Sequence, residues 1–232
     1  MAMRRLAAIA AAGLAAVSFL VAGCGGDDTR ASDPRRLGSD LEDVVAAGVP
    51  GALVVVVGES GAVRVARGVA NRATGGAMRA TDRFRVGSIT KTFVAARVLQ
   101  LVAAGKLVLD ARVGRWLPRL VPDAVTVRQL LGHTSGLADY VDDSSIVGAE
   151  ISSPRWLTRL ALARPTVGAP GGRYVYASTN YLVLGLLVER VTGMALEHQL
   201  EERIFRPLDL RRTTFEPGAA RLRVHGYRSH VH

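Results

Sequence analysis

The stretch Phe84-Arg85-Val86-Gly87-Ser88-Ile89-Thr90-Lys91 places a serine and a lysine three residues apart, where an apolar helix is about to begin. Apolar residues then recur at intervals of three and four until Gly105, which predicts a helix. Residues i and i+3 share a helix face, so Ser88 and Lys91 are placed to react together. A hydroxyl is a weak nucleophile, and a neighbouring neutral amine can take its proton. Backbone N–H groups at the helix start would stabilise negative charge on a substrate oxygen.

The Ser-x-x-Lys spacing alone leaves a second interpretation open, in which Ser88 is an N-cap and Lys91 is a solvated surface residue. One feature of the composition favours the chemical interpretation. Lys91 and Lys106 are the only lysines in a chain whose other basic residues are nearly all arginine. A lysine three residues after a helix-opening serine is therefore less expected by chance.

Two further stretches carry polar residues at loop or helix-edge positions. His133-Thr134-Ser135-Gly136-Leu137 follows a short apolar helix, and Tyr176-Ala177-Ser178 follows the turn Ala169-Pro170-Gly171-Gly172. Together with the first stretch, these residues resemble the serine β-lactamase and penicillin-binding superfamily. The similarity is to the branch of class C β-lactamases, D-alanyl-D-alanine carboxypeptidases and related esterases, and it runs from about residue 41 to residue 227.

The resemblance implies an α/β (α+β) fold of the β-lactamase/transpeptidase type, in which an antiparallel sheet is flanked by helices and accompanied by an all-helical region. The local patterns of the sequence agree with this fold. Apolar runs on either side of a Gly-rich turn predict a β-hairpin of strands 52–57 and 63–69. Helical patterns are predicted over 37–47, 127–131, 156–163, 182–192 and 196–204.

The same resemblance assigns roles to four residues. Ser88 corresponds to the acylated nucleophile, Lys91 to its proton partner, and Tyr176 to a phenol or phenolate that relays protons. A cation beside a phenol lowers the pKa of the phenol, which suits a group that takes the serine proton and later activates water. Ser178 is a candidate substrate-binding residue, because it stands where the family usually has an asparagine that holds a substrate carbonyl. Its hydroxyl has one donor where the amide has two, which argues slightly against a true β-lactamase.

These roles imply a serine acyl-hydrolase that forms an acyl-enzyme on Ser88 and releases it with water. D-alanyl-D-alanine carboxypeptidase-like and β-lactamase-like activities both fit, with a peptidoglycan stem peptide, a β-lactam or an ester as substrate. An esterase of the same family is the alternative.

The third motif of the family is a Lys or His, a small residue and then Gly, on a later sheet strand that this sequence does not reach. We therefore expect the N-terminal portion of a longer hydrolase, with its C-terminal sheet strands missing. A catalytically inactive truncated lipoprotein that binds wall peptide or a partner is a further alternative.

The first residues have the pattern of a bacterial targeting signal. Arg4 and Arg5 precede the apolar stretch 6–20, which is short for a membrane anchor, and Val21-Ala22-Gly23-Cys24 resembles a lipobox. Lipid attachment at Cys24 would hold the protein on the extracytoplasmic face of the cell membrane. Cys24 is the only cysteine, which excludes a disulfide within the chain. The expected organisation is a lipoprotein signal peptide over 1–23, a flexible tether over 24–36 and a hydrolase domain over 37–232.

Composition limits the other functions that are open to the chain. Apolar residues make up 49% of its 232 residues, enough for a sizeable core. The net charge of +10 comes from scattered arginines. They do not form the basic patch interleaved with aromatic residues that nucleic-acid binding needs. A positive charge of this size would suit binding to anionic membrane or wall polymers. Neither a metal nor a cofactor is expected, because no cluster has metal-ligand spacing. His133 lies too close to Ser135 in sequence to activate it, and is expected to support the site.

Overall fold

The computed structural model describes residues 33–58, 61–142, 153–215 and 224. The predicted signal peptide, Cys24 and most of the predicted tether lie outside the described residues. The chain forms two compact units, one of residues 1–86 with 221–232 and the other of residues 87–220.

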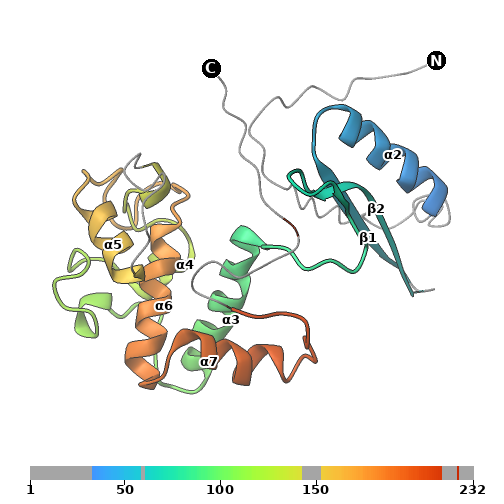
Figure 1. The fold of residues 1–232 in the computed structure, drawn as a ribbon. Helices are drawn as coiled ribbons and strands as arrows, with labels where there is room; N and C mark the ends of the chain where they lie inside the picture. The colour runs from blue at the N-terminus through green and yellow to red at the C-terminus, as the bar shows by residue number, and fades with distance from the viewer. Residues whose placement is uncertain (1–32, 59–60, 143–152, 216–223, 225–232) are drawn as a thin grey trace, which may run out of the picture. The chain divides into compact units, whose positions relative to one another are not determined.

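The first unit is a helix packed on a β-hairpin (Figure 1). Strands β1 (Gly51–Gly58) and β2 (Gly61–Asn71) pair antiparallel from Gly51 opposite Gly68 to Gly58 opposite Gly61, which confirms the predicted hairpin. A short β3 (Gly76–Ala77) completes the sheet in the order β1-β2-β3. This third strand has two residues, too few for any periodicity to predict it.

Helix α2 (Pro34–Ala46) begins three residues before the predicted start. The side chain of Asp33 accepts the N–H of Arg35 at 2.9 Å, and Pro34 occupies the first helical turn, where its missing N–H costs nothing. Capping chemistry thus extends the helix beyond its apolar residues.

The second unit is helical, and its elements begin with the turn that carries the first motif. In chain order the described elements are η1 (Gly87–Ile89), α3 (Thr90–Ala103), η2 (Val113–Arg115), α4 (Val127–Leu131), η3 (Tyr140–Asp142), α5 (Pro154–Leu162), α6 (Thr179–Thr192), α7 (Leu196–Leu200) and the π-helix η5 (Glu201–Phe205). Within the residues that the structure describes, no helix is long and apolar enough to cross a membrane.

Helix α6 is the centre of this unit, since it packs against α3, α4, α5 and α7 (Figure 1). Its residues Val183 to Val188 are all buried, as expected for a helix that is apolar on every side. Val98 of α3 and Leu130 of α4 are fully buried in the same apolar cluster. The core therefore fixes the start of α6 relative to α3 and α4.

Besides α2, three other predicted helices differ from the observed ones at their ends. Helix α5 starts at Pro154 because the hydroxyl of Ser153 caps it, accepting the N–H of Trp156 at 3.1 Å. Helix α6 starts at Thr179, where polar residues bonded to a neighbouring loop replace the apolar pattern. The helix predicted over 196–204 is α-helical only to Leu200 and continues as a π-helix.

Candidate active site

Ser88 lies in the single turn η1, directly before the first residue of α3. Ile89 is the N-cap of α3, and no side chain caps this helix end. The interpretation of Ser88 as a capping residue is therefore wrong. Lys91 follows in the first turn of α3 and is half-buried, so it is not a fully solvated surface lysine either.

The side chains predicted for the site converge on the hydroxyl of Ser88. The Nζ of Lys91 donates to Ser88 Oγ at 3.0 Å, and the phenol of Tyr176 donates to the same oxygen at 2.8 Å. Lys91 Nζ also lies 3.4 Å from Ser178 Oγ, a long contact. Two segments separated by 88 residues thus bring together all four residues singled out in the sequence.

The phenol of Tyr176 is electrostatically perturbed. Burial raises its pKa, but the Lys91 ammonium and the Ser88 hydroxyl beside it have the larger combined effect, and the pKa of Tyr176 falls below the ordinary 10.0. The ammonium of Lys91 lies 5.0 Å from the centroid of the Tyr176 ring. Tyr176 therefore loses its proton more readily here than a free phenol does in water.

The loop after α4 holds the Tyr176 segment in place through backbone hydrogen bonds. Val175 N–H donates to the carbonyl of His133 at 2.9 Å, and Gly171 N–H donates to the carbonyl of Thr134 at 2.8 Å. The His133 ring stacks on Tyr176, with centroids 4.5 Å apart. These contacts belong to a supporting loop, as the sequence predicts.

Two residues that no sequence motif marks also position the site. Asp139 accepts the N–H of Ser178 at 2.9 Å, and Asn180 is 1% exposed and contacts His133. Nothing in the sequence pointed to Asp139, since a loop carboxylate is usually solvated. The sequence does carry a signal for Asn180. It is a polar residue at the start of the strongly apolar helix α6, and a buried polar side chain needs a hydrogen-bond partner.

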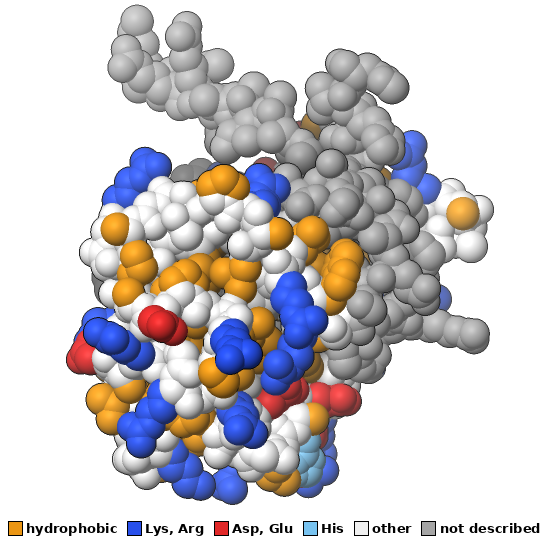
Figure 2. All heavy atoms as spheres, turned by 90° about the vertical axis from the view of Figure 1, so that its left-hand side faces the viewer, with side chains coloured by type: hydrophobic (Ala, Val, Ile, Leu, Met, Phe, Trp, Pro, Cys, Tyr) orange, Lys and Arg blue, Asp and Glu red, His pale blue; other side chains and the backbone are white. Residues whose placement is uncertain are grey.

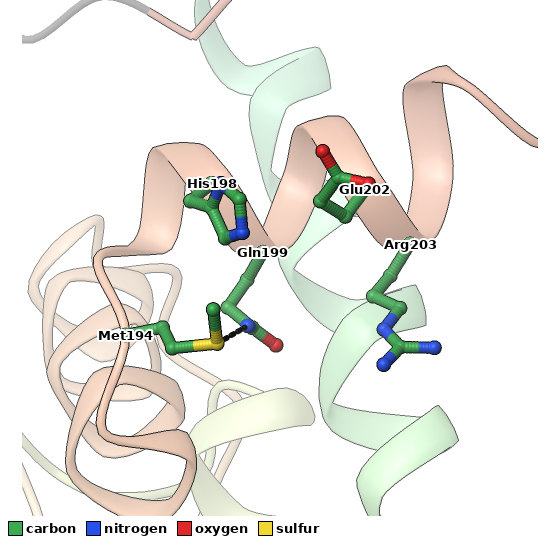
Figure 3. Close-up of a pocket in the computed structure, with 5 residues that line it drawn as sticks. All are labelled: Met194, His198, Gln199, Glu202 and Arg203. Atoms are coloured by element: carbon green, nitrogen blue, oxygen red, sulfur yellow. Dashed lines mark hydrogen bonds between the residues drawn. The ribbon is translucent and has the colours of Figure 1, made fainter.

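A separate hollow of about 480 Å³ lies on α7 and η5 (Figure 3). The residues that line it are Met194, His198, Gln199, Glu202 and Arg203. Several of these groups are already bonded, since Gln199 binds Arg97 and Met194, and Glu202 pairs with Arg206. The hollow includes none of the reactive cluster, so the site is assigned from the chemistry of Ser88 and its neighbours.

Among the residues that the structure describes, the charged side chains give no second candidate site. Figure 2 shows one face of the molecule, where Lys and Arg side chains are spread among hydrophobic and uncharged ones. This agrees with the scattered arginines of the sequence. Within the described ranges, no three His, Cys, Asp or Glu side chains are grouped so that they could hold a metal ion.

Comparisons with known proteins point to one family. Residues 37–231 match the family model Beta-lactamase. Penicillin-binding protein 4 of Amycolatopsis lactamdurans is 38% identical over 187 residues, which cover 76% of this chain and 48% of that protein. Esterase EstB of Burkholderia gladioli is 37% identical over 179 residues, covering 68% and 45%.

A solved structure gives the same answer for the fold. The D-stereospecific amidohydrolase from a Streptomyces species superposes with a TM-score of 0.69 at 35% identity, covering 77% of this chain and 55% of that one. The chain thus spans about half the length of the proteins it matches. Its fold is of the predicted β-lactamase/transpeptidase type, here a three-stranded antiparallel sheet with helices. Because the match to the family model spans residues 37–231, more than half of the sequence, the chain belongs to the Beta-lactamase family.

Proposed function

We propose that the protein is a serine acyl-hydrolase that forms an acyl-enzyme on Ser88. The observation that carries this proposal is the pair of hydrogen bonds on Ser88 Oγ, from Lys91 Nζ at 3.0 Å and from the Tyr176 phenol at 2.8 Å. A nucleophile, a cation and a titratable phenol within direct reach of one another are the parts that acyl transfer requires.

Ionisation of Tyr176 prepares the nucleophile. A phenolate has no proton to donate, so the contact between the two oxygens reverses and Ser88 becomes the donor. As Ser88 Oγ attacks the substrate carbonyl carbon, its proton passes to the phenolate, and the positive charge of Lys91 stabilises the anion before transfer. The N–H groups at the start of α3, which have no acceptor within the helix, face the developing oxyanion in this proposal.

Collapse of the tetrahedral intermediate completes acylation. The bond to the leaving group breaks as the Tyr176 phenol gives its proton to the departing nitrogen or oxygen. Water then attacks the acyl carbon while the phenolate takes one water proton, and Ser88 Oγ recovers that proton as it leaves. No group outside Ser88, Lys91 and Tyr176 is needed to balance the protons.

For the substrate, we propose a D-alanyl-D-alanine carboxypeptidase-like or β-lactamase-like activity on a peptide, lactam or ester carbonyl. The names of the relatives, a penicillin-binding protein, an esterase and a D-stereospecific amidohydrolase, support this range. Ser178 favours a peptidase or an esterase over a β-lactamase, because its single hydroxyl is shorter than the usual amide and offers one donor.

Covalent labelling of Ser88 tests the proposal. The protein is incubated with a fluorescent penicillin and, separately, with a fluorophosphonate, and its intact mass is measured. We expect one label per chain with at least one probe and none in Ser88→Ala. The control is Ser39→Ala, which removes an exposed hydroxyl on α2 and leaves labelling unchanged. Persistent labelling of Ser88→Ala, or no labelling of the folded wild type by either probe, contradicts the proposal.

We further propose that the protein is a lipoprotein anchored through Cys24 on the extracytoplasmic face of the cell membrane. The support is the sequence alone, which has two arginines, an apolar stretch and Val21-Ala22-Gly23-Cys24 in the order of a lipoprotein signal. Such a location suits an enzyme that acts on wall peptides or on incoming antibiotics. The test is to extract washed membranes with salt and with detergent. If the protein is a lipoprotein, detergent should release it and salt should not.

A further inference from the structure

The buried ring of His133 makes contacts that the acyl-transfer scheme leaves unused. Its backbone φ is +55°, in the left-handed region, and its residue surface is 8% exposed. A non-glycine residue keeps such a backbone only where its surroundings hold it. The ring lies nearly parallel to Tyr176, with centroids 4.5 Å apart and an interplanar angle of 25°. His133 therefore forms one wall of the space that the Tyr176 ring occupies.

The hydrogen bonds around this ring fix which nitrogen carries the proton. The backbone N–H of Ala177 donates to Nδ1 at 3.2 Å, and a backbone N–H can only donate. The side-chain nitrogen of Asn180 lies 3.1 Å from the same atom. Nδ1 is therefore an acceptor, and in the neutral ring the proton sits on Nε2.

A short chain of hydrogen bonds sets the orientation of the Asn180 amide. The hydroxyl of Ser135 accepts the N–H of Leu137 at 3.2 Å and donates to Asn180 Oδ1 at 2.5 Å. The amide oxygen is thus occupied, and the amide nitrogen turns toward His133. Because every partner here is buried, a change of any donor into an acceptor leaves an unsatisfied group.

The charges around His133 also favour the neutral ring. Burial is the largest effect and lowers the pKa of His133, and the positive charge of Lys91 lowers it further, against the opposing effect of the Asp139 carboxylate. The phenol rings of Tyr174 and Tyr181 contact the imidazole at 5.7 and 5.3 Å between centroids. Burial raises the pKa of Tyr181, so this phenol faces the ring uncharged.

We propose that His133 is a positioning residue that works only as the neutral Nε2–H tautomer, holding Tyr176 against Ser88 by stacking and by accepting the N–H of Ala177. The proposal rests on the acyl-transfer function proposed for Ser88 and adds a pH limit to it. A proton on Nδ1 would face the N–H groups of Ala177 and Asn180 and would add a second cation beside Lys91. Tyr176 would then lose its support on the acid side of neutrality.

Two variants test the hydrogen-bond acceptor of His133 and its stacking ring separately. His133→Asn keeps an acceptor oxygen near the place of Nδ1 and has no titratable group. His133→Phe keeps a stacking ring and removes the acceptor. We expect His133→Phe to slow acylation of Ser88 by the fluorophosphonate about 10- to 100-fold at pH 7, because Tyr176 is displaced. His133→Asn keeps the acceptor but loses the stacking ring, and it should slow acylation by less than His133→Phe does.

The pH profile of acylation tests the role of the neutral ring. If a phenolate activates Ser88, the rate falls about tenfold per pH unit below the phenol pKa. A second group that must also be unprotonated makes the wild-type fall steeper at a pH below the ordinary imidazole pKa of about 6.5, because burial lowers the pKa of His133 from that value. His133→Asn lacks that group, so its profile keeps the shallower slope. Superimposable profiles of the two proteins would overturn the proposal.

A measurement that needs no reaction separates this proposal from the function of Ser88. Long-range proton–nitrogen NMR of the wild type reports the tautomer of His133 and its titration. We expect an unprotonated Nδ1 at pH 7 and a midpoint below 6.5. A proton on Nδ1, or a midpoint at the ordinary value, overturns the assignment even if Ser88 is labelled. If Ser88 is never labelled but the tautomer is as expected, the acyl-hydrolase function fails and the His133 network stands as a support for Tyr176 alone.

Discussion

In the proposed mechanism, the reactivity of Ser88 depends on a single neighbouring phenol. Lys91 Nζ donates to Ser88 Oγ at 3.0 Å. Tyr176 contacts the same oxygen and has a lowered pKa, so the proposed mechanism assigns proton transfer to it. Lys91 contributes its positive charge.

Replacement of the phenol by a phenyl ring removes this acceptor. We expect Tyr176→Phe to slow labelling of Ser88 by about 10²- to 10⁴-fold, the usual range for loss of a general base. The wild-type rate should rise with pH and level off below pH 10, because the phenol pKa lies below its ordinary 10.0, and the variant should lose that dependence. The measurement is the rate of fluorophosphonate labelling between pH 6 and pH 10.

Tyr174→Phe is the matched control for this substitution. Tyr174 is 64% exposed and lies in the same segment, but no hydrogen bond joins it to Ser88 within the described residues. Its labelling rate should stay within about twofold of the wild type. Equal losses in the two variants would show that the segment, and not the Tyr176 hydroxyl, limits the reaction.

Among the connecting elements, the loop after α4 depends most on a glycine. Gly136 has φ +74°, and a Cβ added there would overlap the carbonyl oxygen of Gly168. The carbonyl of Gly136 accepts the N–H of Val167 at 2.9 Å, so the two segments approach as closely as backbone allows. This approach sets the position of the loop that supports Tyr176.

Gly136→Ala should destabilise the protein by about 3 kcal/mol or more, because it adds a clash between two backbones to a strained φ. Gly105→Ala is the matched control, since Gly105 has φ +68° just after the end of α3 and nothing lies within 4 Å of a Cβ added there. That change should cost only about 1 kcal/mol, from the left-handed backbone alone. Urea unfolding followed by circular dichroism measures both, and equal costs would contradict the argument from close approach.

The elements that the sequence predicted well are those whose signal is local. The hairpin and helix α4 follow from apolar runs, and a capping box at Thr126 and Gln129 marks the start of α4. The starts of α2 and α5 were missed by two or three residues because capping residues and proline, not apolar periodicity, decide them. The π-helix after Leu200 has no local signature that would separate it from an α-helix.

For the molecule as a whole, the sequence predicted only those site residues that belong to a recognisable motif. Ser88, Lys91, Tyr176 and Ser178 were found through their motifs, and the structure brings them together. Asp139 was not found, because its bond to the N–H of Ser178 joins residues 39 positions apart and leaves no pattern in either segment. Contacts of this kind depend on tertiary packing, which no local periodicity reports.

The net charge of +10 belongs to the whole chain and, if the protein is the proposed lipoprotein, should act on its attachment to membranes together with Cys24. Scattered arginines give a weak, long-range attraction to anionic lipid, which salt screens, since the Debye length falls to about 3 Å at 1 M. A covalently attached diacylglyceryl group is held by the hydrophobic effect, which salt does not weaken. The two contributions therefore differ in their response to the same wash.

We expect the full chain, expressed in bacteria, to stay with the membrane fraction in about 1 M salt and to be released by detergent. Cys24→Ser should be released by salt alone, because only the charge of the arginines then holds it to the membrane surface. Release is measured by immunoblot of washed membranes across a series of salt concentrations. A wild type that salt removes would contradict lipid attachment at Cys24. A Cys24→Ser variant that resists salt would instead mean that the apolar stretch 6–20 remains in the membrane as the anchor.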